Sequence, residues 1–198
     1  MGRGHTMSAT VGAMRAQGAD AARYSLPAIA LHWLMAALLF WQIAIGLYMV
    51  DLPKRTPAVA YFYNLHKSFG LVALMLAVIR LWWRFRSPPP RSLGLHASAL
   101  EEKAAQVSHR LLYACMLLIP LFGFLASNFG KHPVRFFGYV LPQLGWDSPL
   151  LQSFFRLSHA SLAWLLCGLI AVHVFAVGRH LLNSGGLILQ RMLPRLWR

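Results

Sequence analysis

The chain has 198 residues, of which 58% are hydrophobic and 12% are charged. A soluble domain carries about 25% charged residues, so this composition indicates a one-domain membrane protein. The net charge of +14 would suit nucleic acid, but the basic residues stand at the ends of apolar stretches, as positive-inside loops do, and we expect no nucleic-acid partner. Cys115 and Cys167 lie inside apolar stretches and no CxxCH motif is present, which argues against a disulfide framework, a zinc site or covalently attached haem.

Residues 1–22 are small and unpatterned, and we expect them to form a flexible cytoplasmic tail. Four later stretches are apolar and long enough to cross a bilayer as helices. These expected helices cover residues 24–51, 61–85, 104–127 and 153–180. Together they predict a four-helix transmembrane domain over residues 23–184.

The segments between the expected helices differ in character. The SPPPR run breaks the second helix, and residues 92–103 form a polar connector. Residues 128–152 are rich in Gly, Pro and aromatic residues, and we expect this long loop to fold back over the bundle. Residues 185–198 are basic and are expected to lie on the membrane surface.

The distribution of basic residues predicts the orientation. With the flanking helix ends included, the side that holds both termini carries 13 Lys and Arg residues, and the opposite side carries six. Cytoplasmic loops carry the excess of positive charge. The predicted fold is therefore an all-α, up-down-up-down transmembrane four-helix bundle with both termini in the cytoplasm.

Four histidines within these helices sort into two depths. His159 and His173 are fourteen residues apart on the fourth helix, so they are separated by about 21 Å and point within about 40° of each other. The chain enters the first helix from inside and the second from outside, which places His32 near the inner surface and His66 near the outer surface. The predicted pairs are His32 with His173 inside and His66 with His159 outside.

Two imidazoles that face each other across a bundle suit bis-histidine ligation of a haem iron. Zinc is a poor alternative because it takes four ligands, usually with Cys or a carboxylate among them. The alternative is that the four histidines are neutral and form hydrogen bonds with neighbouring helices instead of binding haem. Glycines within the spans would let a planar ligand or another helix approach the backbone; they are Gly46, Gly70, Gly123 and Gly168.

Several motifs together resemble the bacterial dihaem cytochrome b561 family over about residues 23–194. They are YSLPAIALHW, NLHKSFG, SHRLLYACMLLIPLFG, SHASLAW with HVFAVGRH, and QRMLP. The resemblance implies a membrane cytochrome with two haem b groups, ligated by the residues at His32, His66, His159 and His173. The family includes a superoxide oxidase, which passes an electron from superoxide outside to ubiquinone near the inner haem. His180 matches its quinone-side histidine, but Arg179 and Leu181 flank it where many relatives have a histidine pair.

Three further polar residues have more than one reading each. His109 occupies the family's HxxLY position, where it would contact a haem propionate or act as a capping or interfacial histidine. Lys67 and Arg156 flank the outer histidines, where they would bind propionates, attract an anionic substrate, or simply extend to the membrane interface. The sequence leaves these alternatives open.

The expected function is one-electron transfer through two haems between an outer partner and quinone on the inner side. The first alternative is a haem-bearing subunit that serves a partner dehydrogenase or a periplasmic protein and catalyses nothing itself. The second alternative is a haem-free transporter or assembly protein. Transport would favour acidic residues within the membrane, and the expected spans contain none apart from Asp51, the last residue of the first one.

Overall fold

The computed structural model describes residues 23–88, 90, 98–184 and 187–193. Its helices are α2 (Leu26–Val50), α3 (Pro57–Arg86), α4 (Ala99–Asn128), α5 (Pro149–Ser184) and the short α6 (Leu187–Gln190). The first four are long and apolar enough to cross a membrane. The prediction of an all-α transmembrane four-helix bundle is confirmed, whereas the cytoplasmic location of the termini stays a prediction.

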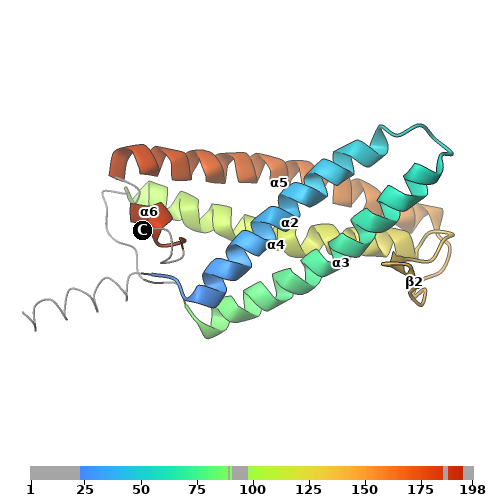
Figure 1. Cartoon of the computed structure of the whole chain (residues 1–198), viewed down its shortest axis with the longest axis horizontal. Coiled ribbons are helices and arrows are strands. Elements are labelled where there is room, and N and C mark those ends of the chain that lie inside the picture. Colours follow the sequence, from blue (N-terminus) through green and yellow to red (C-terminus); the bar gives the residue numbers. More distant parts are fainter. Residues whose placement is uncertain (1–22, 89, 91–97, 185–186, 194–198) are drawn as a thin grey trace, which may run out of the picture.

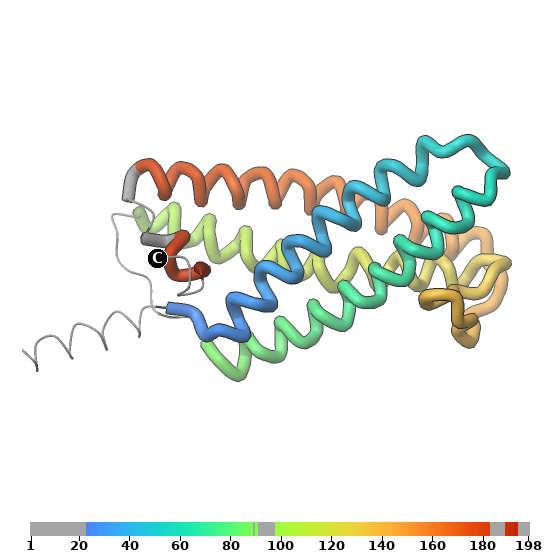
Figure 2. Tube along the Cα trace, in the orientation of Figure 1, coloured from blue at the N-terminus to red at the C-terminus, as the bar shows by residue number. Residues whose placement is uncertain are grey.

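The four long helices form two packed pairs. Helix α2 runs beside α3, and α4 runs beside α5, while α3 also packs against α4 (Figure 1). The start of α2 and the end of α5 lie at one end of the bundle, and the turns after α2 and α4 lie at the other (Figure 2). We call these the inner and outer ends, after the orientation that the sequence predicts.

The buried apolar core is small and lies between α2, α3 and α4. Met35, Ala77 and Met116 form its centre, and Tyr113 packs against them. Among the described side chains, α5 contributes a single buried apolar residue, Leu166. Large apolar side chains cover the outside of the bundle, as a lipid environment allows. Helix α5 therefore packs mainly against α4, and its side chains that face α2 and α3 do not belong to the apolar core.

Three helices begin earlier in the chain than the sequence predicts. Helix α4 starts at Ala99, not at residue 104, because Ser98 accepts a hydrogen bond from the Glu101 backbone and Glu101 accepts one from the Ser98 backbone. This capping box turns the end of the expected polar connector into helix. Pro57 and Pro149 start α3 and α5 four residues early, since proline suits the first turn of a helix.

The long outer loop folds back on the bundle, as expected, and contains a hairpin that the sequence did not predict. Strand β1 (Arg135–Phe136) pairs antiparallel with β2 (Tyr139–Val140). The two turn residues have φ of 46° and 97°, as a type I′ turn requires. The hairpin lies on α3, where the buried Ser68 hydroxyl accepts from the Phe137 backbone N–H at 2.9 Å and donates to the Asn64 carbonyl at 2.8 Å.

The C-terminal segment returns to the start of α2. The Trp33 indole donates a hydrogen bond to the Met192 carbonyl at 2.7 Å, and the Arg191 guanidinium lies 5.8 Å from the centre of the Tyr24 ring. These contacts fix residues 191 and 192 against the bundle. The expected flexible tail at residues 1–22 lies outside the described residues, as do residues 185–186 and 194–198 of the expected basic surface segment.

Candidate functional site

The structure brings together the residues of each predicted histidine pair. At the inner end, His32 of α2 and His173 of α5 have ring centres 6.4 Å apart. At the outer end, His66 of α3 and His159 of α5 have ring centres 6.1 Å apart. Two imidazoles bound to opposite sides of one metal, at bonds of about 2 Å and with ring centres about 1 Å beyond, are separated by about 6 Å. Both pairs fit a metal held between them.

The ring of His159 is positioned by two features of α4. Its Nδ1 donates a hydrogen bond to the Ile119 carbonyl at 2.8 Å. A Cβ atom at Gly123 would lie 3.0 Å from this same nitrogen, so any larger residue at this position would displace the ring. Because Nδ1 carries the proton, the lone pair of Nε2 is free to bind a metal. This is the usual support that a backbone carbonyl gives to a metal-binding histidine.

The ring of His66 lies against α2. A Cβ atom at Gly46 would be 3.4 Å from its Cε1, and the Gln42 amide donates to the His66 carbonyl at 2.9 Å. The Nδ1 of His66 is buried without a hydrogen-bond partner among the described residues. An unpaired buried nitrogen costs free energy. Binding of a metal through Nε2 would leave the proton on Nδ1, so this N–H would still lack an acceptor among the described residues.

The inner pair has charged and polar neighbours where the outer pair has glycines. Arg80 of α3 donates from its Nη2 to the Nδ1 of His32 at 3.0 Å. The same guanidinium lies 5.5 Å from the centre of the Tyr113 ring. The ring of His109 meets that of His173 edge to face, with centres 5.5 Å apart. Neither Arg80 nor Tyr113 is among the site residues that the sequence predicts.

A fourteen-residue spacing on every long helix could have revealed Arg80. The spaced residues are His32 and Gly46 on α2, His66 and Arg80 on α3, His109 and Gly123 on α4, and His159 and His173 on α5. Fourteen residues return to nearly the same face of a helix. Each helix therefore places one residue at each end of the bundle. The inner layer holds three histidines and an arginine, and the outer layer holds two histidines and two glycines.

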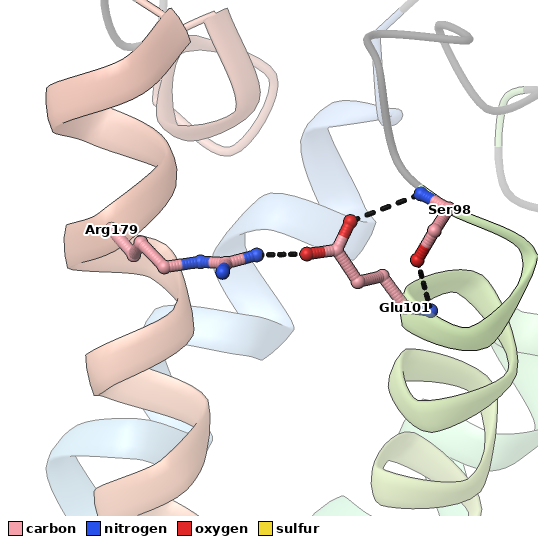
Figure 3. Close-up of polar contacts among 3 residues, drawn as sticks. All are labelled: Ser98, Glu101 and Arg179. Atoms are coloured by element: carbon pink, nitrogen blue, oxygen red, sulfur yellow. Dashed lines mark hydrogen bonds and ion pairs between the residues drawn. The ribbon is translucent and has the colours of Figure 1, made fainter.

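The other predicted site residues lie near these layers. Lys67 is half-buried beside His66, and Arg156 is exposed one turn before His159. His180 lies two turns beyond His173 on α5. Its neighbour Arg179 forms an ion pair with Glu101, which ties α5 to α4 (Figure 3). The roles of these residues with propionates or quinone stay predictions.

The arrangement suits a haem better than a bare metal ion. Within the described part of the chain, no three His, Cys, Asp or Glu side chains form a group that could hold a metal ion. Each pair could therefore supply two ligands, on opposite sides, and the porphyrin of a haem would supply the remaining four. A bis-histidine haem leaves no open position for oxygen and favours electron transfer.

Comparison with known proteins identifies the family of the chain. The family model described as prokaryotic cytochrome b561 matches residues 23–195. Cytochrome b561 homolog 2 of Escherichia coli (strain K12) is 33% identical over 174 residues, which are 87% of this chain and 92% of that protein. Cytochrome b561 homolog 1 of the same organism is 27% identical over 177 residues, 87% of this chain and 98% of that protein. The chain thus belongs to the prokaryotic cytochrome b561 family, as a multi-pass, haem-binding electron-transfer protein of the bacterial inner membrane.

Proposed function

We propose that this chain binds two haem b groups and transfers single electrons between them across the membrane. His32 and His173 would hold the inner haem, and His66 and His159 the outer haem. The observation that carries this proposal is the pair of imidazole separations, 6.4 and 6.1 Å, at the two ends of one bundle. Since His159 and His173 are about 21 Å apart along α5, the facing edges of two haems would be much closer than their centres.

The residues of the chain would bind, orient and insulate the haems, which supply the one-electron chemistry. The Ile119 carbonyl holds His159 in the tautomer that binds iron. Apolar helices exclude water from the space between the layers. Bis-histidine ligation and burial together set the reduction potentials.

We further propose that superoxide is the outer electron donor and ubiquinone the inner acceptor, following the resemblance of the chain to superoxide oxidase. Two superoxide ions would each lose one electron and leave as O₂. One ubiquinone would take up these two electrons with two protons from the inner side and become ubiquinol. Lys67 and Arg156 would attract the anion, and His180 would hold or pass a proton at the quinone.

The haem content of the purified protein tests the first proposal. Pyridine haemochrome analysis should give two haems per chain for the native protein and one for His66→Ala or His159→Ala. His32→Ala or His173→Ala should lose the inner haem instead. The matched control is His132→Ala, which removes an exposed loop histidine and should retain both haems. One haem or none in the native protein would refute the two-haem assignment.

A partner-free assay separates the enzyme from the alternative of an electron-transfer subunit. Purified protein is given superoxide and ubiquinone, and ubiquinol formation is measured without any other protein. Enzymatic activity should yield one ubiquinol for two superoxide ions. A protein that binds both haems yet forms no ubiquinol above the uncatalysed rate would favour the subunit. Exposed aromatic residues of the outer loop, Tyr139 at 79% and Trp146 at 67%, could then form its docking surface.

A further inference from the structure

Arg80 is a cation placed well inside a spanning helix, beside a candidate haem ligand. It lies in α3 (Pro57–Arg86), about 9 Å before the helix end by its residue count. Its Nη2 is 3.0 Å from His32 Nδ1, and its Nε donates to the Tyr113 hydroxyl at 3.4 Å. Charged side chains at such positions are costly and usually have a partner and a role.

The contact between Arg80 and His32 is incompatible with iron binding by His32 through Nε2. A guanidinium has only N–H donors, so the Nδ1 of His32 must be the acceptor and the proton must be on Nε2. A histidine that binds a metal through Nε2 has its proton on Nδ1 instead. Arg80 and His32 would then present two donors to each other. The guanidinium must therefore move away when His32 becomes a ligand.

Among the residues that the structure describes, no carboxylate forms an ion pair with Arg80. The chain has five acidic residues, and none lies within α2, α3 or α5. Glu101 and Glu102 are at the start of α4, two turns before His109, and Glu101 already pairs with Arg179. A haem carries its own carboxylates, the two propionates. Arginine binds a carboxylate through two parallel hydrogen bonds, which makes a propionate a suitable partner.

We propose that Arg80 and the Tyr113 hydroxyl form the propionate-binding site of the inner haem, and that Arg80 transfers from His32 to a propionate when this haem binds. The inference rests on the proposed two-haem function and deepens it. The two positions of the outer layer that hold no histidine are Gly46 and Gly123, and the cation next to the outer pair is Lys67, which follows His66. A nearby positive charge favours the reduced iron, and Arg80 thus raises the potential of the inner haem above the value that it would have without this cation.

A raised potential of the inner haem fits the proposed direction of electron transfer. An electron that enters at the outer haem moves to the inner haem more readily if the inner potential is higher. Arg80 would therefore be a positioning residue with an electrostatic effect, which acts through the haem propionate. It would not itself take part in any proton transfer.

The test compares Arg80→Gln with Arg86→Gln, which removes an exposed arginine from the end of the same helix. Spectroelectrochemical titration gives the potentials of both haems, and resonance Raman spectra report the propionate bending band. In Arg80→Gln we expect the potential of the inner haem to fall by about 59 mV, which shifts the equilibrium distribution of one electron about tenfold toward the outer haem. The propionate band should also shift. Arg86→Gln should match the native protein, and Arg80→Lys should restore most of the potential.

Each result decides the inference. Unchanged inner potential and propionate band in Arg80→Gln with both haems bound would overturn it and leave the two-haem function standing. If Arg80→Gln loses the inner haem, the propionate band is measured in Arg80→Lys instead. Lysine keeps the positive charge, but its ammonium cannot form the two parallel hydrogen bonds to a propionate. An altered propionate band in that variant supports the inference, and an unchanged band overturns it. A native protein without an inner haem would overturn both this inference and the proposed function.

Discussion

Single residues explain why the two histidine pairs are not equivalent. At the outer end, the Nδ1 of His159 already donates to a carbonyl, and Gly123 and Gly46 leave space for the rings of His159 and His66. At the inner end, the Nδ1 of His32 accepts from Arg80. The outer ligand His159 is therefore ready to bind iron, whereas His32 must first exchange its tautomer and lose a hydrogen bond. We infer that haem binding costs more rearrangement at the inner site.

The first prediction concerns the space at Gly123. In Gly123→Ala the new methyl would lie 3.0 Å from the Nδ1 and 3.2 Å from the Cε1 of His159, so the ring must shift and its bond to Ile119 is weakened. The loss of an orienting hydrogen bond typically lowers metal affinity about 10–100-fold. Outer-haem occupancy should fall, as measured by haem per chain and by reduced-minus-oxidised spectra.

The control for Gly123→Ala is Gly168→Ala. A Cβ atom at Gly168 would meet no heavy atom of the described structure within 4 Å. Alanine also favours a helix over glycine by about 1 kcal/mol, so this variant should fold well and retain both haems. Full outer-haem occupancy in Gly123→Ala would show that displacing the His159 ring does not weaken haem binding.

At the scale of elements, Asn128 links the end of α4 to the outer loop. Its side chain donates to the Phe124 carbonyl at 3.0 Å and accepts from the Leu144 backbone N–H at 2.9 Å. Its own carbonyl accepts from the Gln143 amide at 3.0 Å. Asn128 is 3% exposed, so these bonds are shielded from water. One residue thus fixes both ends of the segment that carries the hairpin.

The second prediction is that Asn128→Ala loosens this loop. The Leu144 N–H would lose the acceptor that joins it to α4, and a hydrogen bond of this kind contributes about 0.5–1.5 kcal/mol. Because the loss is local, proteolysis within residues 129–148 should become faster while the helices stay intact. The control is Ser153→Ala, an exposed hydroxyl on α5. Equal cleavage rates in the native protein and Asn128→Ala would mean that the loop is held by other contacts, such as those of Ser68.

At the scale of the whole molecule, the outer half carries an excess of positive charge. The basic residues are Lys54, Arg55, Lys67, Lys131, Arg135 and Arg156, and the acidic residues are Asp51 and Asp147. These six positive and two negative charges leave an excess of four. A positive surface raises the association rate of an anion, and salt screens this effect.

The third prediction is that reduction of the haems by superoxide slows as ionic strength rises. Lys67→Gln combined with Arg156→Gln should slow it further with both haems still bound, because two cations nearest the outer pair are removed. Reduction from the quinol side should change little. Stopped-flow rates over a salt series give the measurement. A flat profile with superoxide would exclude steering and leave these residues as propionate partners or interfacial anchors.

The fourth prediction concerns orientation in the membrane. A reporter that is active only in the periplasm, fused after Arg198, should be silent because the C-terminus is expected inside. The same reporter inserted in the outer loop after His132, an exposed position, should be active and serves as the positive control. Activity of the C-terminal fusion would reverse the orientation and exchange the inner and outer haems.

The sequence alone determined the number of spanning helices and the depth of each candidate ligand. Both follow from local properties: the length of an apolar stretch sets a span, and the helical rise converts residue number into depth. Helix starts were predicted less well. The capping box at Ser98 and the prolines at 57 and 149 are local signals, and none of them follows from the length of the apolar stretch that comes after it.

Only the tertiary structure decided which side chains meet. Residue numbers gave the depth of His32 and His173, but their 6.4 Å separation depends on how α2 and α5 are rotated about their axes. The contact of Arg80 with His32 and that of His159 with Ile119 depend on the same rotations. Helix rotation is set by packing between residues far apart in the chain. The spacing of residues along one helix cannot specify it.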